Sequence, residues 1–268
     1  MPAVSPFRTV ELSDPAFTGP GLRFATVKSK ALGRRADVTL YAPRGYNKRV
    51  LPLVILLHGV YGSHWAWAMK GGAHRVLQRL VSNEEVPPMM LAMPSDGLWG
   101  DGSGYLTHVE ADYATWIVDE VPALAAMVEP LVEDSPCFIA GLSMGGYGAL
   151  RLGALHPERF KGISAHSSIT HYDQKQDFVE ESLQDYHLKP GQLMGVADTI
   201  LANRAKLPPL RFDCGRSDPL LEHNRELHRR LEEEKVPHEY YEYAGGHTWE
   251  YWSEHLADSL KFFGKRLA

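Results

Sequence analysis

The segment Gly141–Gly145 reads GLSMG, a G-x-S-x-G motif centred on Ser143. It follows a short apolar stretch, Cys137–Ala140, and precedes a helical pattern over Met144–Leu155. A serine at such a strand-to-helix turn has a strained backbone and presents its hydroxyl at the carboxyl end of a sheet, where it can attack a carbonyl group. We therefore predict that Ser143 is a nucleophile. The alternative is a glycine-rich turn with a chemically idle serine.

A serine hydroxyl is a poor nucleophile unless a base takes its proton. With this motif the chain order is serine, acid, histidine, so we expect the base late in the sequence. Of the thirteen histidines, His247 fits best, because it follows a predicted strand, Glu239–Tyr243, in a loop that begins with two glycines. The other late histidines lie before that strand, in the closing helix or on a charged helix: His238, His255, His223 and His228.

Two aspartates compete for the role of the acid that orients the histidine. Asp213 falls inside a predicted strand, Leu210–Cys214, and should point into or beside it. Asp218 lies in the loop that follows, within reach of His247, and we predict that it is the acid. An aspartate before Pro219 is also a good helix N-cap, so capping alone is the alternative, and one carboxylate can do both.

Acyl transfer through a serine also needs backbone N–H groups that stabilise the oxyanion. We predict two donors, the N–H of Met144, next to the nucleophile, and the N–H of Val60. Val60 lies in the turn after the apolar stretch Leu51–Leu57, where two glycines let the backbone approach closely. We expect His58, in the same turn, to hold the loop by hydrogen bonds.

Aromatic side chains flank the predicted site and could bind an acyl group or stack on a sugar. Ser95–Tyr105 is glycine-rich but lacks a phosphate-binding signature, so we interpret it as a loop at the rim of the site. No metal-binding pattern occurs in the sequence, and we predict a site without metal or cofactor. Four residues are candidates for substrate binding, with core packing as an equally good interpretation of each: Tyr61, Trp67, Trp99 and Trp249.

The elements that must position these residues alternate between strands and helices, which indicates an α/β fold with a mostly parallel sheet and helices on both faces. The predicted strands are Asp37–Ala42, of an edge type, Leu51–Leu57, Met89–Met93, Cys137–Ala140, Gly162–Ala165, Leu210–Cys214 and Glu239–Tyr243. The predicted helices are Ala111–Val128, kinked at Pro122, Met144–Leu155, Leu220–Lys235 and Trp249–Leu267.

One connection, residues 167–209, is much longer than αβ connections usually are. It comes after the sixth strand of the predicted fold and contains helix-like pieces at Phe178–Tyr186 and Met194–Asn203. We predict a cap-like insertion that covers part of the site. A solvated excursion without function is the alternative.

Length and composition favour one domain over residues 1–268. The 28 basic and 33 acidic residues give a formal charge of −5, without the electrostatic footprint of a nucleic-acid-binding protein. Two cysteines cannot form a disulfide framework, and we find no secretory signal and no apolar run long enough for a membrane span. We therefore expect a cytoplasmic protein that acts on a small-molecule ester, without nucleic-acid or membrane partners. The sequence does not distinguish a monomer from a homodimer.

Taken together, these motifs resemble the esterase D-like branch of the α/β-hydrolases. The likeness lies in the turn after Leu57, in Gly141–Gly148, in Cys214–Asp218 and in Gly246–Trp252, and it extends from about Phe24 to the C-terminus. The branch includes S-formylglutathione hydrolases, tributyrin-type, feruloyl and acetylxylan esterases, and mycolyltransferases. The resemblance implies an α/β-hydrolase fold, a triad of Ser143, Asp218 and His247, and an oxyanion hole of Val60 and Met144.

We predict a serine carboxylesterase that hydrolyses short-acyl esters through an acyl-enzyme. S-formylglutathione hydrolases usually carry a Thr-Cys pair after the oxyanion turn, where this chain has Val60–His64 (VYGSH), so that activity is an alternative, as is a carbohydrate (acetyl or feruloyl) esterase. An acyltransferase with the same triad is a further alternative, which differs in whether water or an alcohol resolves the acyl-enzyme. A non-catalytic binding protein on this fold is disfavoured, because no triad residue is missing.

Overall fold

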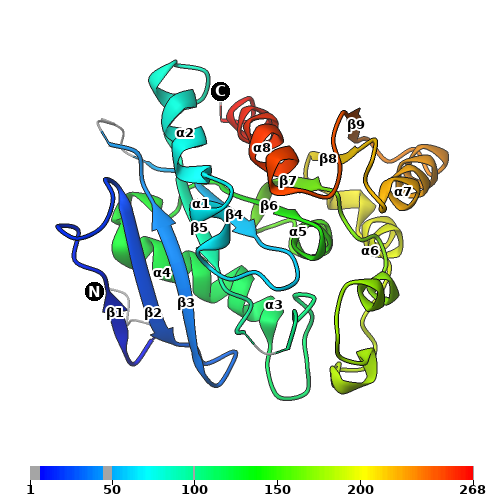
Figure 1. Cartoon of the computed structure of the whole chain (residues 1–268), viewed down its shortest axis with the longest axis horizontal. Coiled ribbons are helices and arrows are strands. Elements are labelled where there is room, and N and C mark those ends of the chain that lie inside the picture. Colours follow the sequence, from blue (N-terminus) through cyan, green and yellow to red (C-terminus); the bar gives the residue numbers. More distant parts are fainter. Residues whose placement is uncertain (1–6, 45–49, 99, 268) are drawn as a thin grey trace.

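A nine-stranded mixed sheet forms the centre of the computed structural model, which describes residues 7–44, 50–98 and 100–267 (Figure 1). The strand order is β1-β2-β3-β5-β4-β6-β7-β8-β9, and all pairs from β5 to β9 are parallel, whereas β1, β2, β3 and β5 pair antiparallel. The sheet is therefore mostly parallel, as predicted. The strands are β1 Val10–Leu12, β2 Leu22–Lys28, β3 Arg35–Tyr41, β4 Leu53–Leu57, β5 Met90–Pro94, β6 Cys137–Leu142, β7 Phe160–His166, β8 Leu210–Gly215 and β9 Glu239–Tyr243.

All seven predicted strands are present, but β1 and β2 were not predicted, and they change the place of β3. We expected β3 at an edge because polar residues alternate along it. It lies between β2 and β5 instead, and that expectation is wrong. Its polar side chains have protein partners: Asp37 accepts a hydrogen bond from Thr26 (2.5 Å), and Thr39 bonds to His64 (2.8 Å). The alternation therefore reflects pairing of polar groups rather than an open edge.

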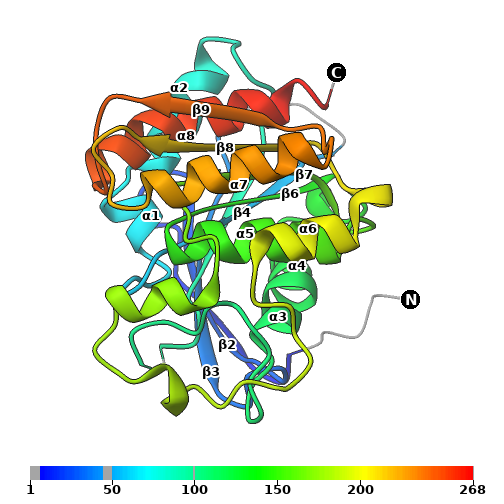
Figure 2. The same ribbon diagram turned by 90° about the vertical axis from the view of Figure 1, so that its right-hand side faces the viewer.

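Helices cover both faces of the sheet (Figures 1 and 2). Along β4, Ile55 and Leu57 pack into the core on one face, and Val54 and Leu56 into the core on the other. A strand buried on both sides therefore appears in the sequence as a continuous apolar run. One face carries α1 Ala66–Met69, α2 Ala73–Ser82 and α8 Trp249–Gly264, and the other carries α4 Val121–Val128, α5 Met144–Leu155, α6 Val196–Ala202 and α7 Leu221–Glu233.

The helix predicted over Ala111–Val128 is divided where the kink was expected. A short helix, α3 Tyr113–Thr115, leads into a π-helical turn, Trp116–Glu120, and α4 follows. The Val121 N–H donates to the Trp116 carbonyl, five residues back, immediately before Pro122. Because proline has no N–H to continue the α-helical ladder, the irregularity falls beside it.

The long insertion, residues 167–209, follows β7, the seventh strand in the chain and not the sixth, because five of the predicted strands and the additional β1 and β2 precede it. Helix α6 lies within the second helix-like piece, whereas the first, Phe178–Tyr186, contains only a short 3-10 turn, Leu183–Asp185. In Figure 1 the insertion extends below α6 in yellow-green. Its Glu180 N–H donates to the Asp101 carboxylate (2.7 Å), so the insertion is attached to the glycine-rich loop.

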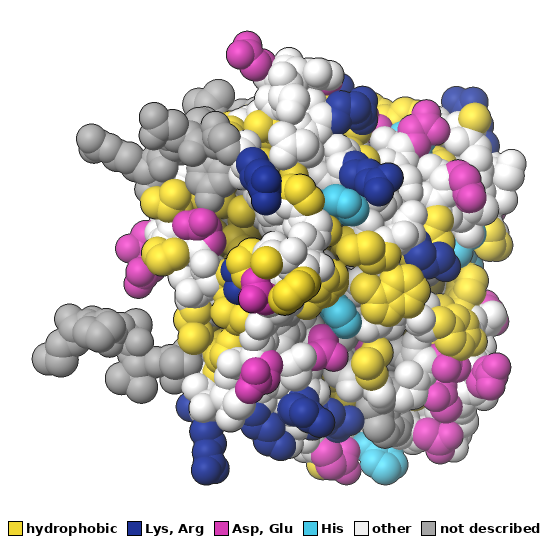
Figure 3. All heavy atoms as spheres, turned by 60° about the vertical axis from the view of Figure 1, so that its left-hand side comes forward, with side chains coloured by type: hydrophobic (Ala, Val, Ile, Leu, Met, Phe, Trp, Pro, Cys, Tyr) yellow, Lys and Arg dark blue, Asp and Glu magenta, His cyan; other side chains and the backbone are white. Residues whose placement is uncertain are grey.

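The antiparallel side of the sheet ends in β1, which has only three residues. A short edge strand offers few unpaired backbone groups to another chain. Acidic, basic and hydrophobic side chains are interspersed on the face in Figure 3. Within residues 7–44, 50–98 and 100–267, no helix combines the length and the apolar character needed to traverse a bilayer.

Candidate active site

Ser143 occupies the turn between β6 and α5 in a backbone conformation that residues other than glycine rarely adopt. Its φ is 53° and its ψ is −121°. The turn is tight enough to exclude neighbouring side chains: a Cβ atom on Gly141 would lie 2.1 Å from the Gly145 carbonyl oxygen, and one on Gly145 would lie 2.3 Å from that of Leu57. The two glycines of the motif thus permit the close approach of β6, α5 and β4, and the serine carries the strain.

A continuous hydrogen-bonded chain joins Ser143 to the loops after β8 and β9. The His247 Nε2 lies 3.0 Å from the Ser143 Oγ, and the His247 Nδ1 lies 2.9 Å and 3.1 Å from the two carboxylate oxygens of Asp218. The Asp218 side chain is fully buried, whereas that of His247 is 19% exposed. A carboxylate only accepts hydrogen bonds, so Nδ1 carries a hydrogen and Nε2 is free to accept the serine proton.

The two candidate acids lie in different surroundings. Asp218 contacts His247 and also accepts a hydrogen bond from the Leu220 N–H (2.9 Å), so its carboxylate serves the turn before α7 as well. Asp213 instead binds His166 and Arg211, each at 2.9 Å. Burial alone would raise the pKa of Asp213, but the donors from His166 and Arg211 hold that pKa below its usual value.

Two backbone N–H groups at the site have no acceptor among the described residues, namely those of Val60 and Met144. In contrast, the neighbouring Tyr61 N–H donates to the Asp101 carbonyl (2.8 Å). His58 stabilises the turn: its Nδ1 lies 2.7 Å from the Gly59 carbonyl oxygen, and its Nε2 accepts the Asp96 N–H (3.2 Å). The role of Val60 and Met144 as oxyanion donors stays a prediction, whereas His58 has the structural contacts expected of it.

A cavity of about 380 Å³ borders Ser143 and His247. Tyr61 and Trp249, two of the four aromatic candidates, line it. Trp67 does not: it is 1% exposed, and its indole N–H donates to the Leu57 carbonyl (2.9 Å), so its selection as a substrate-binding residue is wrong. Trp67 is instead part of the core behind Trp249, whose ring it meets edge-on at 5.7 Å between centroids. Trp99 lies outside the described residues.

The sequence did not reveal the two aromatic rings that contact His247. Phe178, from the insertion, stacks on the imidazole with the ring centroids 5.6 Å apart and the planes at 24°. Trp252, from the first turns of α8, meets it edge-on at 4.9 Å. Trp252 follows His247 by five residues, a closeness that could have suggested contact, whereas nothing local connects position 178 with position 247. The remaining lining includes Trp65, Lys70, Leu142 and Thr248.

In the described ranges, no three histidine, cysteine, aspartate or glutamate side chains group in a way that could hold a metal ion. The arrangement of the site, a strained serine at the carboxyl end of a parallel strand with histidine and aspartate in later loops, is that of the α/β-hydrolases.

Comparison with known proteins gives the family. The family model described as "Putative esterase" matches residues 29–263, and the chain belongs to this family of carboxylic ester hydrolases. The acetyl esterase of Caldicellulosiruptor saccharolyticus is 29% identical over 236 residues, which cover 80% of this chain and 84% of that protein. The S-formylglutathione hydrolase of Paracoccus denitrificans (strain Pd 1222) is 24% identical over 257 residues, 90% of this chain and 91% of that protein. A solved ferulic acid esterase, 26% identical, has a TM-score of 0.74 and covers 98% of this chain and 100% of its own.

Proposed function

We propose that this enzyme is a serine carboxylesterase that hydrolyses short-acyl esters, with Ser143 as nucleophile, His247 as general base and Asp218 as the carboxylate that orients His247. The observation that carries the proposal is the chain of hydrogen bonds from Ser143 Oγ through His247 (3.0 Å) to Asp218 (2.9 Å) at the border of a cavity. A serine and a base at this distance, with the base oriented by a buried acid, can form an acyl-enzyme.

The reaction has two halves. The Ser143 Oγ attacks the ester carbonyl carbon while the His247 Nε2 takes the hydroxyl proton, and this proton then passes to the departing alcohol. Water enters in the second half, gives a proton to His247 and attacks the acyl carbon, and Ser143 leaves as the hydroxyl. In both halves the carbonyl oxygen carries negative charge, which the N–H groups of Val60 and Met144 stabilise.

The volume of the cavity favours a small substrate. Its volume of about 380 Å³ is near the lower end of the range for small-molecule sites, roughly 300–1,000 Å³. Tyr61 and Trp249 are the proposed contacts for the bound ester, and Phe178 of the cap-like insertion covers the imidazole. The aromatic lining favours, as a second candidate, an acetyl or feruloyl ester of a carbohydrate, because aromatic faces stack on phenyl rings and sugars. Relatives named acetyl esterase and ferulic acid esterase agree with this candidate.

The test combines covalent labelling with a substrate panel. A fluorophosphonate probe should label the wild type at Ser143, and nitrophenyl esters of increasing acyl length should be hydrolysed fastest at the short end. Ser143→Ala should abolish labelling and lower kcat by on the order of 10⁴–10⁶-fold. Ser82→Ala, on the surface end of α2, is the matched control and should retain full activity. An active, labelled Ser143→Ala variant would refute the proposal. Sugar acetates, feruloyl esters and S-formylglutathione in the panel separate the candidate substrates.

A further inference from the structure

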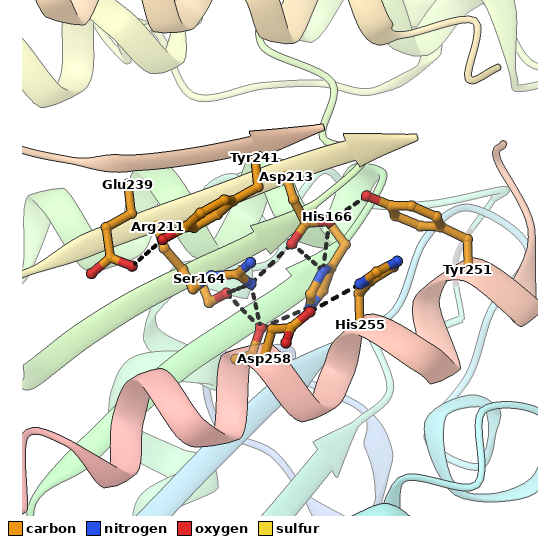
Figure 4. Close-up of polar contacts among 10 residues, drawn as sticks. Ser164, His166, Arg211, Asp213, Glu239, Tyr241, Tyr251, His255 and Asp258 are labelled. Carbon is orange, nitrogen blue, oxygen red and sulfur yellow. Dashed lines mark hydrogen bonds and ion pairs between the residues drawn. The ribbon is translucent and has the colours of Figure 1, made fainter. Parts of the chain in front are cut away.

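A cluster of polar side chains lies buried between β7, β8 and α8, outside the proposed triad (Figure 4). We call it the Asp213 network. None of its members is more than 3% exposed. The network consists of Ser164 and His166 on β7, Arg211 and Asp213 on β8, and Tyr251 and Ser259 on α8.

The Asp213 carboxylate is the centre of the network. It accepts the Tyr251 hydroxyl (2.8 Å), an Arg211 guanidinium N–H (2.9 Å) and the His166 Nδ1–H (2.9 Å). The carboxylate and the guanidinium balance each other in charge, and the Arg211 Nη2 is buried without a hydrogen-bond partner among the described residues. Figure 4 shows Tyr251 reaching from α8 toward Asp213, which joins the helix to the sheet.

Part of the network has the same order of groups as the proposed triad. The Ser259 Oγ lies 2.8 Å from the His166 Nε2, and the His166 Nδ1 contacts Asp213. All three residues are 0% exposed, so no ester can reach them, and they are not a second catalytic centre. A buried ion pair contributes little net stability compared with apolar residues of the same volume. The contacts of the Asp213 network with the active-site loops indicate a role other than stabilising the fold.

The first contact leads to the nucleophile. The Ser143 N–H donates to the backbone carbonyl of His166 (2.9 Å), and the Ser167 N–H donates to the backbone carbonyl of Asp213 (2.8 Å). The strained backbone of Ser143 is therefore bonded directly to the end of β7. The His166 side chain, on that same residue, is held by the network.

The second contact leads to the loops of the acid and the base. Tyr251 packs against Gly245 so closely that a Cβ atom there would lie 2.8 Å from the tyrosine ring. The Gly245 carbonyl in turn accepts the Ser217 N–H (2.8 Å). Ser217 precedes Asp218, and Gly245 lies two residues before His247. The Tyr251 ring thus lies against the point where these two loops meet.

From these contacts we propose that Asp213 and Tyr251 are positioning residues for catalysis. The hydrogen bond between them holds the loops of Asp218 and His247 in a fixed place relative to Ser143. The inference rests on the proposed function, since it assigns the network a role in that reaction.

Tyr251→Phe is the decisive variant, because it removes one hydroxyl and leaves the ring against Gly245. Asp213→Asn would leave the Arg211 charge unbalanced and impair folding. Tyr41→Phe is the matched control: Tyr41 on β3 is also 3% exposed, and its hydroxyl also donates at 2.8 Å to a side-chain oxygen, that of Gln78. Both variants therefore lose one tyrosine hydrogen bond of the same length, which is buried at Tyr251 and part-buried at Tyr41.

Tyr251→Phe should lower kcat about tenfold with KM within twofold of the wild type, since small misplacements of reacting groups are costly to rate. Tyr41→Phe should change neither constant by more than twofold. Amide hydrogen exchange at residues 245–247 should also be faster in Tyr251→Phe than in the control. A folded Tyr251→Phe protein with the kcat and the loop exchange of the control would overturn the proposal. If the wild type hydrolyses no ester, the proposed function fails, and the exchange measurement still decides whether Tyr251 holds the loops.

Discussion

The backbone strain at Ser143 has a measurable cost in stability. Ser143→Gly removes both the Oγ and the Cβ, whereas Ser143→Ala removes only the Oγ. Both variants lose the hydrogen bond to His247, so this loss cancels when they are compared. The remaining difference combines the cost of keeping a Cβ atom at φ 53° and ψ −121° with the larger backbone entropy that glycine loses on folding.

The size of this difference follows from two opposing effects. A non-glycine residue in such a conformation costs about 1–3 kcal/mol. Glycine loses more backbone entropy on folding, which subtracts about 0.5–1 kcal/mol. With central values of about 2 kcal/mol for the strain and about 0.75 kcal/mol for the entropy, Ser143→Gly should be more stable than Ser143→Ala by about 1.3 kcal/mol, and the two ranges together span about 0–2.5 kcal/mol. For a chain of this length, each kcal/mol shifts Tm by about 2 °C, so the gap in Tm should be about 2–3 °C.

Equilibrium unfolding in urea and thermal unfolding of both variants measure this difference directly. Both proteins should be inactive and unlabelled by a fluorophosphonate, so any stability difference is independent of catalysis. A Ser143→Gly protein less stable than Ser143→Ala by about 0.5–1 kcal/mol, the entropy cost of glycine alone, would show that the turn carries no strain at this residue, and the structural argument for a strained serine would be wrong.

Three further predictions concern packing, binding and pH. Gly145→Ala forces a Cβ atom to within 2.3 Å of the Leu57 carbonyl oxygen, so the free energy of unfolding in urea should fall by about 1–3 kcal/mol. Fluorophosphonate labelling of Ser143 should also become slower. A variant with the stability and the labelling of the wild type would contradict this prediction. Trp249→Ala should raise KM for aryl esters about tenfold with a smaller effect on kcat, and steady-state kinetics with an unchanged KM would remove Trp249 from the binding site. Burial lowers the pKa of Lys175 to about 7, and its ammonium faces the Tyr186 ring at 3.0 Å. Above pH 7 the unfolded chain holds this proton longer than the folded protein, so the unfolding free energy of the wild type should rise by about 1.4 kcal/mol per pH unit relative to Lys175→Met, up to about pH 10. A difference that stays constant between pH 6.5 and 9 would contradict it.

Much of the fold could be predicted because its signals are local. The continuous apolar run of β4 and the G-x-S-x-G turn each specify a strand or a strand-to-helix junction within a few residues. The chain order of Ser143, Asp218 and His247 then follows from the topology, since loops at the carboxyl ends of parallel strands meet at one edge of the sheet.

The remaining features depend on contacts between residues far apart in the sequence. The short antiparallel β1 and the alternating β2 have weak patterns, and without them β3 was taken for an edge strand. Trp67 and Trp249 both flank the site in the sequence, and only the direction of each side chain separates a core residue from a cavity residue. Phe178 reaches His247 from an insertion whose nearby turns are too short to show periodicity.

The two aspartates of the sequence analysis illustrate where residue types and spacing cease to be informative. Asp213 and Asp218 each accept the Nδ1–H of a histidine at 2.9 Å, and the Nε2 of each histidine lies 2.8 Å or 3.0 Å from a serine hydroxyl. The two sets are therefore nearly the same in hydrogen-bond geometry. They differ in surroundings: one borders a cavity of about 380 Å³, and the other has no exposed surface. Because an ester must reach the serine, access rather than geometry separates the proposed catalytic set from the buried set of Asp213, His166 and Ser259, and access is a property of the whole fold.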